Sequence, residues 1–244
     1  MKTLKIIIIL SYFAFVGCKS TIYVPQIKYS DTPVKTPIPF ANGIISTDEN
    51  SEFELTFSTD GLKTYFSRRK PNEKQMIYES DFKNGTWSTP KLASFSNNRD
   101  EAAFLTPDGK FLFFGSERPI PNKPNKGNFD MNIWMVEKNS LGWSEPKPLP
   151  EIINQVQIEK EQWPSSNNNF IFTNDNKNYY FTTMLRGNKS IKLYETKFDG
   201  KTFTEPKAIE GIFDDEKFWV YSAVISPNGK FLIRSEERRV GKEC

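Results

Sequence analysis

LTPDGKFLFF, the sequence of residues 105–114, places two apolar runs on either side of a Pro-Asp-Gly turn. In a tight turn, proline presets φ at the first central position, aspartate hydrogen-bonds back to its own backbone, and glycine accepts a positive φ. Apolar runs on both sides of such a turn are typical of a β-hairpin. We therefore predict two antiparallel strands joined at Asp108 and Gly109.

The same hairpin pattern recurs along the chain. The copies read FSTDGLKTYF at residues 57–66, LTPDGKFLFF at 105–114, FTNDNKNYYF at 172–181 and ISPNGKFLI at 225–233. Their turns are 48, 67 and 53 residues apart. Ahead of the first turn, Phe53, Leu55 and Phe57 alternate with polar residues, which is the period of two of a half-buried strand. The chain is therefore expected to consist of one repeating unit.

Two more strand-like segments follow each complete hairpin. Third apolar strands are marked by Ile77-Tyr78, Ile133-Trp134 and Leu193-Tyr194. Fourth segments read GTWSTPKL at 85–92, GWSEPK at 142–147 and TFTEPK at 202–207. Their prolines fit an outer edge strand, where the missing N–H costs little. Four-stranded units with repeats of about 40–50 residues predict the fold class: all-β, a β-propeller of four-stranded antiparallel blades.

The turn and fourth-strand sequences resemble one protein family. TPDGK at 106–110 and SPNGK at 226–230 resemble the S-P-D-G-K signature of TolB-type, WD-repeat-like β-propeller repeats. The Trp-Ser-x-Pro-Lys segments resemble the fourth strand of the secreted members of this family. The resemblance extends over residues 44–233, and it is weakest in the third copy, where Asn176 replaces the turn glycine.

The resemblance implies where the blades lie. They are expected at about residues 44–98, 99–156, 157–211 and, as a partial blade, 212–233. Propellers close with at least about four blades. We therefore expect about three complete blades plus the start of a fourth, in an open arc that results from C-terminal truncation.

The N-terminal end is expected to lie outside the propeller. Two lysines precede the apolar run at 6–17, which is too short to span a bilayer and indicates a signal peptide over residues 1–17. The run leads into Cys18 in a sequence that resembles a bacterial lipobox, which implies that Cys18 is lipidated. An ordinary signal peptide with an incidental cysteine is the alternative. Spaced prolines in residues 18–43 favour an extended tether between the lipid and the domain.

The C-terminal end is also expected to lie outside the propeller. Residues 234–244, RSEERRVGKEC, match what a common short-read sequencing adapter encodes, and we interpret them as a scar. A genuine basic tail is the alternative. This segment, together with Lys2 and Lys5, carries the whole net charge of +3. Residues 18–233 are therefore neutral, and charge gives no reason to expect nucleic acid as a partner.

The composition restricts the chemistry that is possible. The 244 residues contain no histidine, which excludes His general bases, Ser–His and Cys–His dyads, and His-ligated zinc or haem. The two cysteines lie in the terminal segments. No glycine-rich turn leads into a helix that could cradle a phosphate. We expect no cofactor and no metal, and a non-enzymatic role is favoured.

Carboxylates precede each predicted first strand. In a propeller this strand lines the central channel, so these groups would ring one mouth of it. The candidate ligand-binding residues are Asp100, Glu101, Glu159, Glu161, Trp163, Asp215 and Glu216. The alternative interpretation is that these carboxylates are solvated loop residues. A pair of them roughly 5–9.5 Å apart could also hydrolyse a glycoside. The recurring turn residues are explained by the turn itself: Asp60, Asp108, Asp175 and Asn228.

These observations predict a lipid-anchored propeller of the Gram-negative cell envelope that acts as a non-enzymatic protein- or glycan-binding scaffold. The membrane would be reached through Cys18, and the envelope partner is unidentified. Lys19, rather than aspartate, follows the cysteine, which favours an outer membrane lipoprotein on its periplasmic or surface face. The alternative is a carbohydrate-active or peptidase-associated propeller with its site among the channel carboxylates or in the missing C-terminal part.

Overall fold

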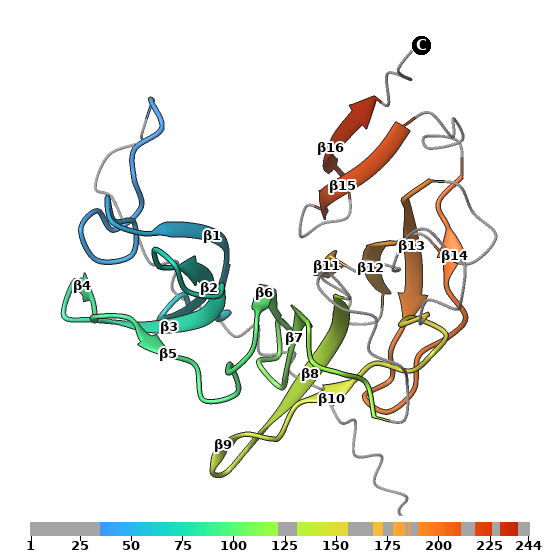
Figure 1. Cartoon of the computed structure of the whole chain (residues 1–244), viewed down its shortest axis with the longest axis horizontal. Coiled ribbons are helices and arrows are strands. Elements are labelled where there is room, and N and C mark those ends of the chain that lie inside the picture. Colours follow the sequence, from blue (N-terminus) through green and yellow to red (C-terminus); the bar gives the residue numbers. More distant parts are fainter. Residues whose placement is uncertain are drawn as a thin grey trace, which may run out of the picture.

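The structure is a computed structural model that describes residues 35–121, 131–155, 168–172, 178–183, 185, 190–210, 218–225 and 230–238. These residues form strands and turns, with no helix among them, and the strands make four antiparallel sheets (Figure 1). The all-β prediction is confirmed.

In each sheet the strands follow one another in chain order. The first sheet contains β1 (Ser51–Phe57), β2 (Lys63–Arg69) and β3 (Met76–Lys83), with β4 (Thr86–Trp87) and β5 (Lys91–Leu92) along β3. The second contains β6 (Asp100–Leu105), β7 (Phe111–Ser116) and β8 (Asn132–Asn139), with β9 (Gly142–Trp143) and β10 (Lys147–Pro148) along β8. The third contains β11 (Asn168–Phe172), β12 (Asn178–Thr183), β13 (Lys192–Lys197) and β14 (Lys207–Ala208). The fourth contains β15 (Phe218–Ile225) and β16 (Leu232–Arg238).

The fourth strand is interrupted in the first two sheets. β4 and β5 both pair with β3, and the residues between them include Pro90. β9 and β10 flank Pro146 in the same way along β8. A proline cannot donate to the ladder, so the strand breaks where the sequence places it. The outer edge therefore forms as predicted, but as two short pieces.

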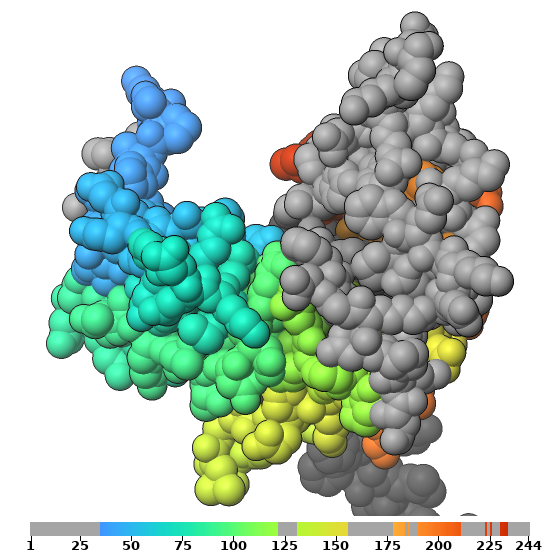
Figure 2. Space-filling model, viewed as in Figure 1, coloured from blue at the N-terminus to red at the C-terminus, as the bar shows by residue number. Residues whose placement is uncertain are grey.

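The four sheets are arranged as the blades of a propeller. The first strands are in contact in succession, β1 with β6, β6 with β11 and β11 with β15. Figure 1 shows the sheets fanned around one axis with these strands innermost. In the space-filling view the first and second sheets form one continuous body (Figure 2). Radial order of this kind is the defining feature of a β-propeller.

Most of the described hydrophobic core lies between neighbouring sheets. On β7, Phe111 and Phe113 pack toward Tyr179 of the third sheet, whereas Leu112 and Phe114 belong to the core shared with the first sheet. Alternate residues of a strand point to opposite faces, so a middle strand between two neighbours must be apolar at every position. This explains the uninterrupted FLFF sequence.

In the hairpin turns at Asp60 and Asp108, the aspartate side chain accepts hydrogen bonds from neighbouring residues of the turn. Asp108 Oδ1 accepts hydrogen bonds from Thr106 Oγ1 at 2.6 Å and from Lys110 N at 3.0 Å. Asp60 makes the same bond with Ser58 Oγ at 2.6 Å. Gly109 has a φ of +69°, the left-handed conformation that favours glycine. The turn role of these two aspartates is confirmed, and the corresponding turns at Asp175 and Asn228 lie outside the described residues.

The Ser or Thr of the fourth-strand motif fastens the outer edge. Its hydroxyl oxygen accepts a hydrogen bond from a third-strand N–H in the pairs Asp81–Ser88 (3.0 Å), Glu137–Ser144 (3.0 Å) and Lys197–Thr204 (2.9 Å). The backbone N–H of the same Ser or Thr donates back to the third strand. The recurrence of this residue therefore has a structural cause.

A turn ahead of β1 covers the outer face of the first sheet. Ile45 is fully buried there with Phe66 and Trp87, and Phe40 and Ala41 pack against the same cluster. Phe40 and Ala41 lie within residues 18–43, the segment expected to form a tether. In the structure these two residues contact the first sheet.

Several expectations fall on the ends of the chain. The signal peptide at 1–17 and Cys18 lie outside the described residues. β16 continues into the segment interpreted as an adapter scar and pairs with β15 as far as Arg238, while the origin of the segment stays a prediction. Among the described residues no helix is long and apolar enough to cross a membrane.

Candidate functional site

Two of the residues predicted to bind a ligand are described, Asp100 and Glu101, and both lie at the start of β6. The others lie outside the described residues: Glu159, Glu161, Trp163, Asp215 and Glu216.

Asp100 is fully buried and is held by the protein itself. Its Oδ1 accepts a hydrogen bond from Arg118 Nη1 at 2.7 Å. Its Oδ2 accepts from Ser96 Oγ at 2.8 Å and from the backbone N–H of Asn97 at 3.1 Å. The Arg118 guanidinium also lies over the Phe114 ring, 5.3 Å from its centroid. Asp100 therefore joins the loop before the second sheet to the segment that follows β7.

The same acid–arginine pair occurs in the first sheet. Glu52 Oε1 lies 2.9 Å from Arg68 Nε, and Arg68 Nη2 donates to the carbonyl oxygens of Ile44 at 3.1 Å and Ile45 at 3.0 Å. The Arg68 guanidinium lies 5.2 Å from the centroid of Phe66. Because the arrangement occurs in both the first and the second sheet, Asp100 belongs to the framework of these two sheets.

Glu101, the next residue, belongs to a different environment. Its Oε2 lies 3.3 Å from Arg99 Nη2, and Arg99 Nη1 lies 3.0 Å from Glu117 Oε1. The Glu101 side chain is 13% exposed. It lies against Gly115 of β7, where an added Cβ would meet the Glu101 Cγ at 3.6 Å and the Met131 Cε at 3.3 Å. The added Cβ would touch the Glu101 side chain at an ordinary contact distance and would be crowded only by Met131.

Glu54 completes this group from the first sheet. It sits in a bulge of β1 with a φ of +55°. Its Oε2 accepts hydrogen bonds from the backbone N–H of Ala102 at 2.7 Å and from Ser67 Oγ at 3.2 Å. Ala102 is itself in the bulge of β6, with a φ of +54°. Glu54 thus bridges the inner strands of neighbouring sheets, and with Glu101, Glu117 and Arg99 it forms what we call the acid cluster.

Desolvation raises the pKa of both Glu54 and Glu101 above the ordinary value of 4.5, even though Glu54 as a whole residue is exposed to solvent. At Glu54 the hydrogen bonds from Ala102 and Ser67 oppose this rise in pKa. At Glu101 the Arg99 charge opposes it, while the neighbouring charge of Glu54 adds to it. The protein therefore holds two glutamates in surroundings that disfavour their charged form.

These shifts predict how Glu54→Gln changes the pH dependence of stability. A carboxyl group with a raised folded pKa stabilises the fold most when protonated, below pH 4.5, and this contribution is lost as the pH rises through the folded pKa. Glutamine keeps the oxygen that accepts from Ala102 and removes the charge. We expect the variant to lose less free energy of unfolding than the parent between about pH 4 and 7, measured by denaturant titration at each pH.

The control for this experiment is Glu73→Gln. Glu73 is a surface glutamate with a side chain that is 48% exposed, so its substitution removes the same charge at the surface. Its pH profile should follow that of the parent. If the Glu54→Gln profile also follows the parent, the ionised Glu54 carries no cost in the folded protein.

The acid cluster has the chemistry of a binding surface for positive charge. It holds three carboxylates and one guanidinium on adjacent sheets. Within the described residues no group of three or more His, Cys, Asp or Glu side chains is placed to hold a metal ion. Lysine or arginine side chains of a partner would supply the hydrogen-bond donors that these carboxylates accept.

The sequence predicted only part of this group. Glu101 was among the candidates, whereas Glu54, Arg99 and Glu117 were not. Glu54 occupies a polar position within a strand, and its reach toward Ala102 depends on bulges in two strands. In the repeats Glu54 and Ala102 occupy equivalent positions of the first two inner strands, 48 residues apart, and this equivalence is the signal in the sequence that relates them.

The structure of this chain is similar to solved structures of propeller proteins. No family model matches the sequence, and no curated protein does. TolB from Acinetobacter baumannii is 16% identical with a TM-score of 0.49, over 81% of this chain and 40% of that one. The periplasmic gluconolactonase PpgL of Pseudomonas aeruginosa is 13% identical with a TM-score of 0.46, over 76% of this chain and 50% of that one. This chain thus spans half or less of the length of these two proteins.

Proposed function

We propose that this propeller is a non-enzymatic scaffold of the bacterial cell envelope, attached to a membrane through a lipidated Cys18, which binds a protein or glycan partner. The lipobox-like sequence before Cys18 supports the anchor and the envelope location. Outer membrane attachment is part of the proposal because Lys19 follows the cysteine.

The acid cluster is the observation that supports a binding role. Glu54, Glu101 and Glu117 are gathered by residues of β1, β6 and the segment after β7, so the folded propeller, and not one loop, creates the surface. Since one arginine is shared by Glu101 and Glu117, carboxyl groups outnumber guanidinium groups in the cluster. We propose that a protein partner presents lysine or arginine side chains to it, an arrangement that favours association and selects against acidic partners.

The proposal is tested with the full chain in envelope membranes. Crosslinking and capture by the parent should recover a partner with a basic surface, and Glu101→Gln should reduce that recovery by roughly threefold to tenfold, as expected for a lost interfacial charge. Glu145→Gln removes the same charge at the outer edge of the second sheet and should leave capture unchanged. Cys18→Ser should move the protein from the membrane to the soluble fraction.

Two outcomes would contradict the proposal. Equal capture by the parent and Glu101→Gln would exclude the acid cluster as the binding surface. Turnover of a sugar or peptide substrate that is lost in Glu101→Gln would mean that the carboxylates are catalytic.

A further inference from the structure

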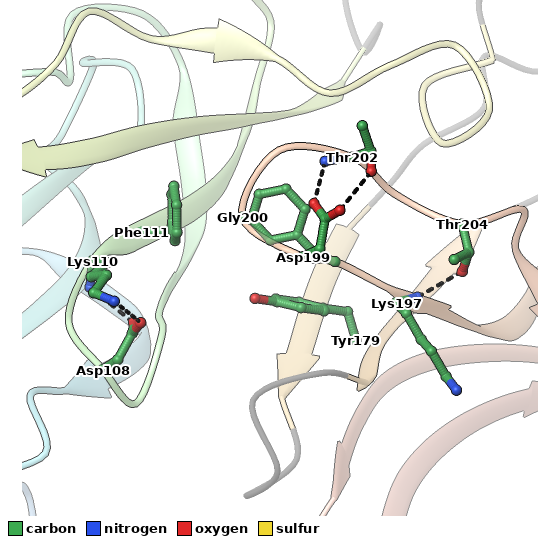
Figure 3. A pocket seen from close by; sticks show the side chains of 10 residues that line it. Asp108, Lys110, Phe111, Tyr179, Lys197, Asp199, Gly200, Thr202 and Thr204 are labelled. Carbon is green, nitrogen blue, oxygen red and sulfur yellow. Dashed lines mark hydrogen bonds and ion pairs between the residues drawn. The ribbon is translucent and has the colours of Figure 1, made fainter.

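Each described core between two sheets combines two different faces, which we call the trailing face of one sheet and the leading face of the next. Between the first and second sheets, Tyr65 lies on the trailing face and Leu105 on the leading face. Between the second and third sheets, Phe111 is on the trailing face and Tyr179 on the leading face, and Figure 3 shows these two residues at the junction. The third junction follows the same order, so a trailing face meets a leading face at all three.

The leading face of the first sheet is exposed at its inner strand. The pairing of β1 with β2 has the same register as that of β6 with β7, so Leu55 and Phe57 correspond to Ala103 and Leu105. Ala103 and Leu105 are each 6% exposed because the first sheet covers them, whereas Leu55 and Phe57 are each 37% exposed. Positions that are buried at an internal junction are therefore open to solvent at this end of the arc.

The turn ahead of β1 does not take the place of a neighbouring sheet. It buries Ile45 against the outer part of the leading face of the first sheet. Corresponding turns ahead of the second and third sheets bury Phe95 and Ile153. Those two residues lie in cores to which a preceding sheet also contributes. The turn is thus an ordinary part of a junction, and a sheet can pack beside it.

The trailing face of the fourth sheet is exposed in the same way. The register of β15 with β16 matches that of β6 with β7, which places Phe231 and Ile233 at the positions of Phe111 and Phe113. In the second sheet these positions are 9% and 0% exposed, whereas Phe231 is 68% and Ile233 is 71% exposed. The two ends of the arc in Figure 1 therefore present apolar faces of opposite kinds.

Faces of this kind indicate an interface with a second copy. In an array of repeats, the outer faces that stay in water are polar, because each terminal repeat must keep the array soluble. Here both end faces carry apolar residues at the positions that form junction cores. A trailing face fits a leading face at each described junction, and one chain exposes one of each. The surface that complements either end is therefore the other end of another copy.

We propose that two copies of this chain close one ring, in which the fourth sheet of each copy packs its trailing face on the leading face of the first sheet of the other. Two equal head-to-tail contacts close a ring when the rotation between copies is half a turn. Two copies supply twice four sheets, and propellers typically have about 4–8 blades, so a third copy would exceed that range. This inference goes beyond the proposed function, since it needs neither the acid cluster nor the lipid anchor.

The test is sedimentation velocity, with light scattering, of the full chain carrying Cys18→Ser, so that a lipid does not contribute to association. This parent should have twice the mass of one chain, with a dissociation constant of roughly 1–10 μM. Leu55→Asp and Ile233→Asp each place a carboxylate in a contact that excludes water, and each should weaken the dimer by about tenfold or more. Both side chains are exposed in the single chain, so both variants should keep the parent's circular dichroism spectrum.

Leu141→Asp is the matched control. Leu141 is 97% exposed in the turn between β8 and β9, away from both end faces, and its substitution introduces the same charge. This variant should form dimers like the parent. Glu101→Gln should also form dimers while it loses the basic partner, which separates this inference from the proposed function.

Mixing the two interface variants tests the head-to-tail arrangement. Leu55→Asp keeps an intact trailing face and Ile233→Asp keeps an intact leading face. An equimolar mixture can therefore form one unaltered junction, and it should dimerise more strongly than either variant alone but more weakly than the parent. A contact between two equal faces would instead leave one of the two variants dimeric on its own.

Four results would overturn the inference. A parent that stays monomeric at about 100 μM would mean that further blades of a longer chain, or another protein, cover the end faces. A dimer that survives either interface substitution would lie elsewhere on the surface. Equal loss of the dimer in Leu141→Asp would show that association is unspecific. Assemblies that grow beyond two copies with concentration would show that the ring does not close.

Discussion

Asp100→Ala is expected to lower the free energy of unfolding by about 3–5 kcal/mol, the usual cost of removing one partner from a buried ion pair. Asp100 has no exposed surface, and the Arg118 side chain is 10% exposed. Without the carboxylate, the Arg118 guanidinium stays enclosed and loses its countercharge. The hydroxyl of Ser96 and the backbone N–H of Asn97 lose their acceptor as well. Denaturant unfolding of the parent and variant measures the loss.

Two further variants make this result specific. Asp100→Asn keeps an oxygen acceptor and removes the charge, so its loss should be intermediate. Asp48→Ala removes an exposed aspartate ahead of β1 and should change stability by no more than about 0.5 kcal/mol. If Asp100→Ala were as stable as Asp48→Ala, the ion pair with Arg118 would not hold the second sheet together.

Phe113→Ala is expected to cost a similar amount, about 3–5 kcal/mol, through loss of packing. Phe113 is fully buried between the second and third sheets. Its ring meets Tyr179 at 5.5 Å, Phe198 at 6.0 Å and Phe203 at 6.2 Å, in each case edge to face. Rigid rings from two sheets cannot collapse into the space that one ring leaves. Thermal and denaturant unfolding would both report the change.

Phe113→Leu and Phe53→Ala are the controls for this prediction. Leucine keeps most of the buried volume and should cost less than about 1.5 kcal/mol. Phe53 lies on β1 and is 37% exposed, so its truncation removes less buried surface. Equal losses for Phe113→Ala and Phe53→Ala would show that the core between the second and third sheets contributes little to stability.

The hairpins and their order could be predicted from the sequence because their signals are local. Pro107, Asp108 and Gly109 each have their own reason to form a turn, and FLFF has the composition of a strand buried on both faces. The interruption of the fourth strand was not predicted. The prolines were expected at the outer edge, but whether a short strand continues past Pro90 depends on its pairing with β3.

The candidate site was harder to predict because it depends on which way neighbouring side chains point. Asp100 and Glu101 are adjacent and were given one role. Successive residues of a strand face opposite sides, so Asp100 meets Arg118 inside the sheet and Glu101 joins Arg99 and Glu117. Nothing in the local sequence indicates that Arg118 is the partner of Asp100, since the two are brought together only by the pairing of β6 and β7.

Cores that lie between sheets couple the unfolding of one blade to that of its neighbours. Apart from the cluster under the turn before β1, the described cores are shared by two blades, so each blade is stabilised by the neighbour that covers it and the coupling passes from one blade to the next. Stability is then close to a sum of nearest-neighbour terms, as in a linear array of repeats. Damage at one junction spreads first to the two blades that share it, while those beyond keep their cooperativity.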